Sequence, residues 1–294
     1  MDSTESRYAE IARKMLETGN WLTPQFDYGV PFWGKPPLST WLSAATMAAL
    51  GVGEFAARLP SFLLALACGI PVALHAASRG GRDQSLWALA LFASTGLVFV
   101  AAGAVMTDAA LALGTTMSMT GFWIAVSGPD RHRAMASTTF FFGLAIGLLA
   151  KGPVAAVLTF LPVGAWIAFE RRWREAWTRL PWFAGLLLTA ALVVPWYWAA
   201  ERATPGFLDY FLVGEHWKRF VEPGWKGDLY GAAHARPRGM IWVYAIAVAL
   251  PWSALALAWL ARALARRRAD VVALGADPWR LYLVLWTVAP MVFF

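Results

Sequence analysis

The sequence DSTESRYAEIARKMLETGNWLTPQFDYGVPFWGKPPLSTW, residues 2–41, is the most polar long segment of a 294-residue chain that is otherwise mostly apolar. Its first half has the pattern of an amphipathic helix, with these apolar residues at the spacing of one helical face: Tyr8, Ile11, Ala12, Met15 and Leu16. Gly19 suits the end of that helix, and Pro37 suits the first position of a second one. Such helices can lie flat on a membrane with their apolar side toward lipid, although an ordinary surface helix has the same pattern.

The composition is that of an integral membrane protein. Hydrophobic residues make up 59% of the chain and charged residues 15%, whereas a soluble domain has about 25% charged residues. Many of the 18 tryptophans lie close to charged loops, where an amphipathic ring suits the level of the lipid headgroups. The single cysteine, Cys68, lies in an apolar run, so it forms no intrachain disulfide and is predicted to pack against its neighbours.

Eight apolar runs approach the roughly 20 residues that a helix needs to cross a bilayer. They are 57–77, 84–104, 108–127, 134–150, 153–169, 180–200, 239–261 and 281–294. The sequence therefore predicts an all-α integral membrane protein, a multi-span helical bundle with amphipathic helices at its surface. The fourth and fifth runs are separated only by Lys151-Gly152-Pro153, which predicts a tight helical hairpin at the membrane boundary.

These runs divide the chain into four parts. A first loop, 1–56, precedes six spans in 57–200, and a second loop, 201–238, precedes two spans in 239–294. The last run would reach only about 21 Å as a helix, short of the ~30 Å hydrocarbon core. The chain also begins in a loop, with no span or signal peptide before it, so we expect a fragment of a longer protein.

Arginines are concentrated in every second loop, after the first, third, fifth and seventh runs. They are Arg79, Arg82, Arg131, Arg133, Arg171, Arg172, Arg174, Arg179, Arg262, Arg266, Arg267 and Arg268. The positive-inside rule makes these loops cytoplasmic, so the first loop and residues 201–238 face the periplasm of a bacterial inner membrane. Because most of the net charge of +7 lies in these loops, the charge gives no support to nucleic-acid binding.

Three carboxylates on the outer side are candidates for catalysis. Asp2 and Glu5 lie in the first loop beside Arg7 and Tyr8, and Asp108 lies at the outer mouth of a span. An ionisable group at the edge of the hydrocarbon is expensive and indicates function. The alternative for Asp108 is helix capping, because aspartate is a favoured N-cap residue. Carboxylates in such a place suit general-base work or the stabilisation of developing positive charge.

The same side carries cations and histidines from separate loops. The cations are Lys35, Lys151, Lys218 and Arg219, and they suit a lipid phosphate, although each could instead extend toward the headgroups. His216 and His234 are the better histidine candidates, because His75 lies inside a span and His132 in a cytoplasmic loop. No metal-ligand spacing is evident, so a divalent metal is compatible with the sequence without being indicated by it.

An ordered set of motifs resembles one glycosyltransferase family over nearly the whole chain. The set comprises TESRYAEIAR at 4–13, GNWLTP at 19–24, GKPP at 34–37, MTD at 106–108, AKGPV at 150–154, PWY at 195–197 and HWKRF at 216–220. It resembles the bacterial polyprenyl-phosphate-sugar-dependent glycosyltransferases, the group that contains the lipid A aminoarabinose transferase and is related to the protein O-mannosyltransferases. The resemblance implies a GT-C-type bundle with amphipathic helices on the periplasmic surface, without its first span, later spans and C-terminal domain.

The resemblance also implies the roles of particular residues. Family members carry an Asp-Glu pair three and two residues before the arginine of the first motif, where this chain has Thr4 and Glu5, with an aspartate at Asp2. Either Asp2 or Glu5 is therefore the expected first-loop acid, acting with Asp108 on the acceptor. The expected donor-binding and lipid-phosphate residues are Arg7, Tyr8, Lys35, Lys151, His216 and Arg219.

The resemblance implies a reaction at the periplasmic face. A sugar linked to a polyprenyl phosphate would enter from the bilayer and pass by a single inverting displacement to lipid A, another lipid or glycan, or a protein. No nucleotide-sugar site is expected, because the donor is activated on the cytoplasmic side.

A lipid or small-molecule transporter, or flippase, is the main alternative. Transporters place polar groups at the bilayer midplane, whereas here charged residues gather at one face and are nearly absent from midspan. A purely structural membrane subunit would need no charged residues at the mouths of its spans.

Overall fold

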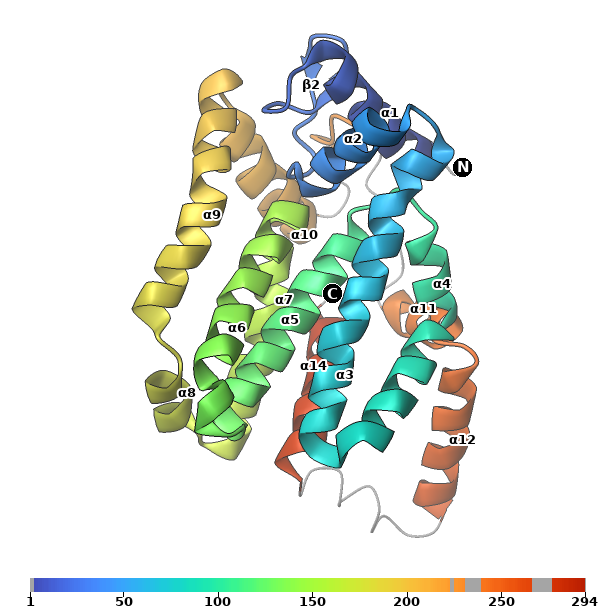
Figure 1. The fold of residues 1–294 in the computed structure, drawn as a ribbon, viewed down its shortest axis with the longest axis vertical. Helices are drawn as coiled ribbons and strands as arrows, with labels where there is room; N and C mark the ends of the chain where they lie inside the picture. The colour runs from blue at the N-terminus through green and yellow to red at the C-terminus, as the bar shows by residue number, and fades with distance from the viewer. Residues whose placement is uncertain (1–2, 223–224, 231–238, 266–276, 294) are drawn as a thin grey trace.

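The computed structural model describes residues 3–222, 225–230, 239–265 and 277–293, and Figure 1 shows it as a tall helical bundle. Its helices are α1 Ser3–Thr18, α2 Leu38–Leu50, α3 Glu54–Ala93, α4 Gly96–Ala102, α5 Asp108–Ser127, α6 Asp130–Lys151, α7 Pro153–Glu170, α8 Trp173–Arg179, α9 Trp182–Ala203, the π-helix η1 Asp209–Lys218, α10 Arg219–Val221, α11 Met240–Val248, α12 Trp252–Ala265 and α14 Pro278–Phe293. A short antiparallel pair, β1 Gln25–Asp27 and β2 Val30–Pro31, is the exception. The predicted all-α membrane fold class is confirmed, with this hairpin as an addition.

Five described helices, α3, α5, α6, α7 and α9, are long and apolar enough to cross a membrane. Helices α11 and α12 are bent by 112° relative to each other. Counted together as one broken span, they would make a sixth. The run 239–261 is therefore not one straight span. The run 84–104 is not one either, because Ser94 and Thr95 separate the end of α3 from α4. The division of the chain into four parts stays a prediction.

Helix α3 reverses direction at a pair of glycines. Gly80 is non-helical, and Gly81 has φ +65° and ψ −152°, a conformation that side-chain-bearing residues rarely adopt. The first apolar run therefore ends before this turn, and the second begins after it. Figure 1 places this turn and α8 at the end of the bundle opposite to α1, α2 and the β-hairpin.

The apolar face of α1 packs on protein rather than on lipid. Ile11 and Met15 are almost completely buried, and Met15 packs with Ala44 of α2 and Ala56 of α3. The expected orientation of this face toward the lipid boundary is therefore wrong, because α2 and the start of α3 provide a closer apolar surface. The predicted end of α1 is confirmed, since Gly19 follows Thr18 with φ +66°.

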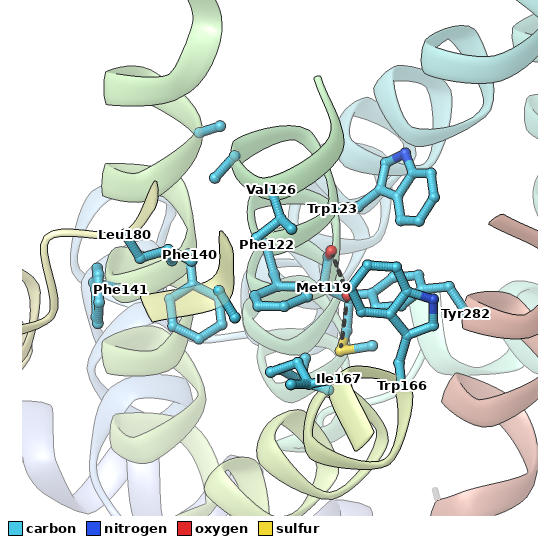
Figure 2. Close-up of a cluster of buried hydrophobic side chains, with 14 residues drawn as sticks. Met119, Phe122, Trp123, Val126, Phe140, Phe141, Trp166, Ile167, Leu180 and Tyr282 are labelled. Carbon is cyan, nitrogen blue, oxygen red and sulfur yellow. Dashed lines mark hydrogen bonds between the residues drawn. The ribbon is translucent and has the colours of Figure 1, made fainter. Parts of the chain in front are cut away.

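The main core joins α5, α6, α7 and α14. Figure 2 shows its largest side chains, which include Phe122, Phe140 and Trp166. The hydroxyl of Tyr282 donates a hydrogen bond to the carbonyl oxygen of Met119 at 2.7 Å, so the one polar atom of this buried ring is satisfied. Helix α14 is thus fixed against α5 from the far end of the chain.

Small residues bring α5 and α6 into backbone contact. A Cβ on Gly114 would lie 2.6 Å from the backbone nitrogen of Gly147, and one on Gly121 would lie 2.6 Å from the carbonyl oxygen of Ala136. Only glycine allows such a close approach, a common feature of helix pairs in membranes. The rigid antiparallel pair holds the first residue of α5, Asp108, beside the last residue of α6, Lys151.

Candidate functional site

An ion pair joins the adjoining ends of α5 and α6. The Lys151 Nζ atom lies 2.7 Å from Oδ1 of Asp108, and 28% and 45% of the two side chains remain exposed. Thr107 is the N-cap residue of α5 and makes no side-chain capping bond. The carboxylate of Asp108 therefore bonds to a cation rather than capping its helix, and both groups remain accessible to a ligand.

Gly152 and His216 fix the backbone next to this pair. Gly152 has φ +75°, and a Cβ there would lie 2.5 Å from the ring of Phe211, so the tight α6–α7 hairpin depends on glycine. His216 lies in the π-helix η1, with Nδ1 2.7 Å from the carbonyl oxygen of Phe211 and Nε2 3.3 Å from that of Lys151. Burial lowers the pKa of His216, so the imidazole is neutral at pH 7 and donates to one of these carbonyls.

A buried carboxylate organises the cations of the first and second loops. The Glu215 side chain is 5% exposed and lies 2.9 Å from the guanidinium of Arg219 and 3.9 Å from Nζ of Lys35. Arg219 also lies 3.4 Å from Asp228, so two carboxylates share its charge. Lys35 donates a hydrogen bond to the carbonyl of Gly34 at 2.7 Å. Burial lowers the pKa of Lys35; the charge of Glu215 opposes this shift, and the charges of Lys151 and Arg219 add to it.

Aromatic residues form the wall between α1 and the second loop. The Tyr230 hydroxyl donates to the carbonyl of Pro31 and accepts from the backbone nitrogen of Trp33, each at 2.9 Å. Its ring packs against Phe32, whose ring meets Tyr8 edge to face. Burial and the charge of Asp108 raise the pKa of Tyr8 to about 12, so its hydroxyl stays protonated at neutral pH. The first loop and residues 225–230 therefore form one unit.

Six of the expected site residues come together here. They are Tyr8, Lys35, Asp108, Lys151, His216 and Arg219, and we call them, with Glu215, the outer cluster. Sequence reasoning did not select Glu215, although its spacing of four residues from Arg219 on a helix was a usable signal. It also missed Asp228 and Tyr230, because nothing in the sequence indicated that this segment folds onto the first loop.

Glu5 bonds to groups outside the outer cluster, whereas Arg7 lies beside it, close enough for its charge to act on Tyr8. The carboxylate of Glu5 accepts a hydrogen bond from Nε of Arg58 at 2.8 Å and one from the backbone nitrogen of Val105 at 3.2 Å. The bond from Arg58 is the main reason why the pKa of Glu5 lies below its usual range. Arg7 lies over the ring of Phe26, 5.8 Å from its centre. These contacts favour a structural role for Glu5, whereas Asp2 and His234 lie outside the described residues.

Glu5→Ala is expected to lower the stability of the protein by about 1–3 kcal/mol, because it leaves Arg58 and the Val105 N–H without their acceptor. Glu5→Gln keeps a neutral hydrogen-bond acceptor and should lower the stability less than Glu5→Ala. Thermal unfolding in detergent, followed together with turnover, checks this order. A Glu5→Gln variant that keeps the melting temperature of the native protein and loses nearly all turnover would contradict the structural role.

The described residues hold no group of three or more His, Cys, Asp or Glu side chains placed to bind a metal ion. In the part of the chain that the structure describes, the outer cluster offers cations for an anionic ligand and a partly exposed carboxylate beside them. Such a set of groups suits phosphate recognition next to proton transfer.

The family profile described as dolichyl-phosphate-mannose-protein mannosyltransferase matches residues 1–211. The chain belongs to this family. One relative is the undecaprenyl phosphate-alpha-4-amino-4-deoxy-L-arabinose arabinosyl transferase of Pseudomonas aeruginosa strain PAO1. It is 33% identical to this chain over 299 residues, which cover 99% of this chain and 50% of the relative. The protein of the same name from Enterobacter sp. strain 638 is 29% identical over 294 residues, with the same coverage of each chain.

Two solved structures share the fold of this mannosyltransferase family member. The crystal structure of ArnT from Cupriavidus metallidurans bound to undecaprenyl phosphate has a TM-score of 0.81 and 26% identity, covering 99% of this chain and 50% of that one. The apo state of the same protein has a TM-score of 0.76 and 22% identity, with coverage of 98% and 54%. The predicted GT-C-type fold is therefore confirmed. The chain spans about half the length of the curated relatives it matches.

Proposed function

We propose that the complete protein is a membrane glycosyltransferase that moves a sugar from an undecaprenyl-phosphate-linked donor to an acceptor, with an amino-pentose as the sugar and lipid A as the acceptor. The observation that carries this proposal is the outer cluster, where Lys35, Lys151 and Asp108 converge at the end of a fold similar to ArnT. The names of the curated relatives support the donor and the sugar.

Lys35 is the best-placed ligand of the donor phosphate. Its side chain is mostly buried, with 21% exposed, and its nearest described carboxylate is 3.9 Å away, so its charge is only partly compensated. Arg219 is closer to two carboxylates and therefore holds Glu215 in position rather than meeting the phosphate first. A phosphate that gains charge as it departs binds a preorganised cation more tightly in the transition state, which lowers the barrier.

Asp108 is the proposed general base. The acceptor oxygen attacks the anomeric carbon and the bond from that carbon to the phosphate oxygen breaks. The bonding electrons go to the phosphate, while the proton of the acceptor passes to Asp108. The ion pair with Lys151 links the two events, because a phosphate that takes over Lys151 leaves the carboxylate uncompensated and more basic.

The transporter alternative lacks support from the arrangement of charges. In the described helices the ion-paired acidic and basic groups lie at helix ends and in loops rather than midway along the spans. A transport site is expected near the midplane.

Mass spectrometry of lipid A from cells with and without the complete gene tests the proposed reaction. Cells that express the gene should carry lipid A heavier by one amino-pentose and should accumulate less of the matching polyprenyl-linked sugar. Unchanged lipid A together with an unchanged pool of lipid-linked sugar would contradict the function. If the lipid-linked sugar were consumed and appeared on a molecule other than lipid A, the protein would still be a glycosyltransferase, but with a different acceptor.

The outer cluster is proposed to face the periplasm. The Arg-rich turns at Arg79 and Arg131 lie at the end of the bundle opposite to α1 and α2, which agrees with the positive-inside rule.

Single cysteines check this orientation in a Cys68→Ala background. Val52→Cys and Lys226→Cys, at exposed positions of the outer end, should react with a membrane-impermeant maleimide in intact spheroplasts. Arg174→Cys, exposed at the Arg-rich end, should react only after lysis. The reverse pattern would overturn the orientation.

A further inference from the structure

A second site lies at the end of the bundle that the outer cluster does not use. A groove of about 1030 Å³ opens between α3, α5 and α6 and reaches the turns where Arg79 and Arg131 lie. Its sides include exposed apolar side chains, among them Leu74 of α3 and Met135 and Phe142 of α6. None of the residues of the outer cluster lines it.

The mouth of this groove is cationic. Arg79, Arg131 and Arg172 line it together with one carboxylate, Asp277. Asp277 lies 3.0 Å from Arg79 and so compensates that arginine. Within the described residues, Arg131 has no carboxylate in ion-pairing distance and donates from Nε to the ring of His132 at 3.0 Å. The mouth therefore keeps a net positive charge that can receive an anion.

Arg172 has the geometry of an anchored phosphate ligand. Its guanidinium lies 5.5 Å from the centre of the Trp166 ring and donates to the Ser127 hydroxyl at 3.3 Å. Among the described residues, its closest carboxylate is that of Glu175, which lies 3.6 Å away and does not line the groove. A guanidinium held by stacking loses little freedom when it binds an anion, and its planar donors match phosphate oxygens.

The length of the groove matches one lipid leaflet. Its floor on α5 runs from Leu113 to Ser127, about 21 Å along a helix, and one leaflet with its headgroups is about 20–22 Å thick, half of a bilayer of about 40–45 Å. The polar end lies at the Arg-rich turns and the apolar part extends toward the middle of the bundle. A water-soluble anion would leave the apolar walls unused, whereas an amphiphile satisfies both parts.

We propose that this groove binds an anionic glycerophospholipid of the leaflet on the Arg-rich side. Its phosphate lies between Arg131 and Arg172, and one acyl chain lies along α5 between α3 and α6. Basic pockets between membrane helices on the cytoplasmic side are suited to anionic headgroups. The bound lipid fills the space between α3 and the rigid α5–α6 pair.

Native mass spectrometry of the complete protein in detergent tests this site. Phosphatidylglycerol and phosphatidylcholine with the same acyl chains are titrated against the native protein, Arg131→Glu and Arg133→Glu. Arg133 is a matched control, since it is exposed on the same helix and does not line the groove. Phosphatidylglycerol should bind in preference to phosphatidylcholine, and Arg131→Glu should weaken its binding about tenfold or more, with Arg133→Glu close to the native protein.

A variant of the apolar wall separates a lipid from a free anion. Leu74→Trp narrows the groove without changing the net charge of the protein. It should therefore weaken the binding of phosphatidylglycerol. If Arg131→Glu and Arg133→Glu changed the affinity for phosphatidylglycerol equally, the proposed site would be wrong. Undecaprenyl phosphate displacing phosphatidylglycerol at equal concentration, or unaltered binding in Leu74→Trp, would also overturn it. These results leave the proposed sugar transfer untouched, because that reaction is measured at the opposite end.

Discussion

Asp108→Asn is expected to lower turnover about a hundredfold or more, because an amide cannot accept the proton of the acceptor. Thr107 and not Asp108 is the N-cap residue of α5, so the amide removes no capping bond, and the ion pair that is lost is partly exposed and worth at most about 1 kcal/mol. Thermal unfolding in detergent should therefore barely change. Transfer from a defined polyprenyl-phosphate sugar, measured beside the melting curve, separates catalysis from folding.

Asp209→Asn is the matched control for this variant. Asp209 also lies in the first turn of a helix, η1, and is exposed outside the outer cluster. The same chemical change there should leave turnover close to that of the native protein. If Asp108→Asn and Asp209→Asn turn over equally fast, Asp108 is not the base.

Lys35→Ala is the second change with a large expected effect. The loss of one charge-assisted contact to the departing phosphate corresponds to roughly 1.5–3 kcal/mol, or about ten- to a hundredfold in kcat/KM. Lys218→Ala removes the same side chain from an exposed position of the same end of the bundle and should have little effect. Equal activity of the two variants would mean that Lys35 does not meet the phosphate.

The pH profile of kcat/KM gives a further test of Lys35. Burial lowers the pKa of Lys35 below that of a free lysine, so the ammonium loses its proton at a lower pH than usual. Activity that needs the charged form is complete below this pKa and falls as the pH rises through it. Lys35→Arg should move the fall to higher pH, since a guanidinium keeps its proton. A fall at the same pH in both proteins would assign it to another group.

Local patterns in the sequence predicted much of this fold. The helical spacing of apolar residues and Gly19 gave α1 and its end, and Gly152 between two apolar runs gave the α6–α7 hairpin. The same reasoning placed Asp108 and Lys151 at helix ends on one side of the membrane. These features depend on residues close together in the chain, where periodicity and backbone preferences decide the structure.

Other features depend on contacts between distant segments. Glu5 bonds to Arg58 and the backbone of Val105, and no local pattern distinguishes that use of a carboxylate from catalysis. The burial of Glu215 follows from the packing of η1 beside the first loop. The break after α3 was missed because Ser94 and Thr95 are tolerated inside an apolar run, although they end the helix here.

Binding of undecaprenyl phosphate to the purified complete protein is the most direct test of the central claim that the outer cluster holds the lipid phosphate. The native protein and Lys218→Ala should bind it alike, and Lys35→Ala should bind it about tenfold or more weakly. Asp108→Asn should bind at least as tightly as the native protein, because Lys151 is then released from its carboxylate. Native affinity in Lys35→Ala, together with weaker binding in Asp108→Asn, would contradict this assignment of the phosphate site.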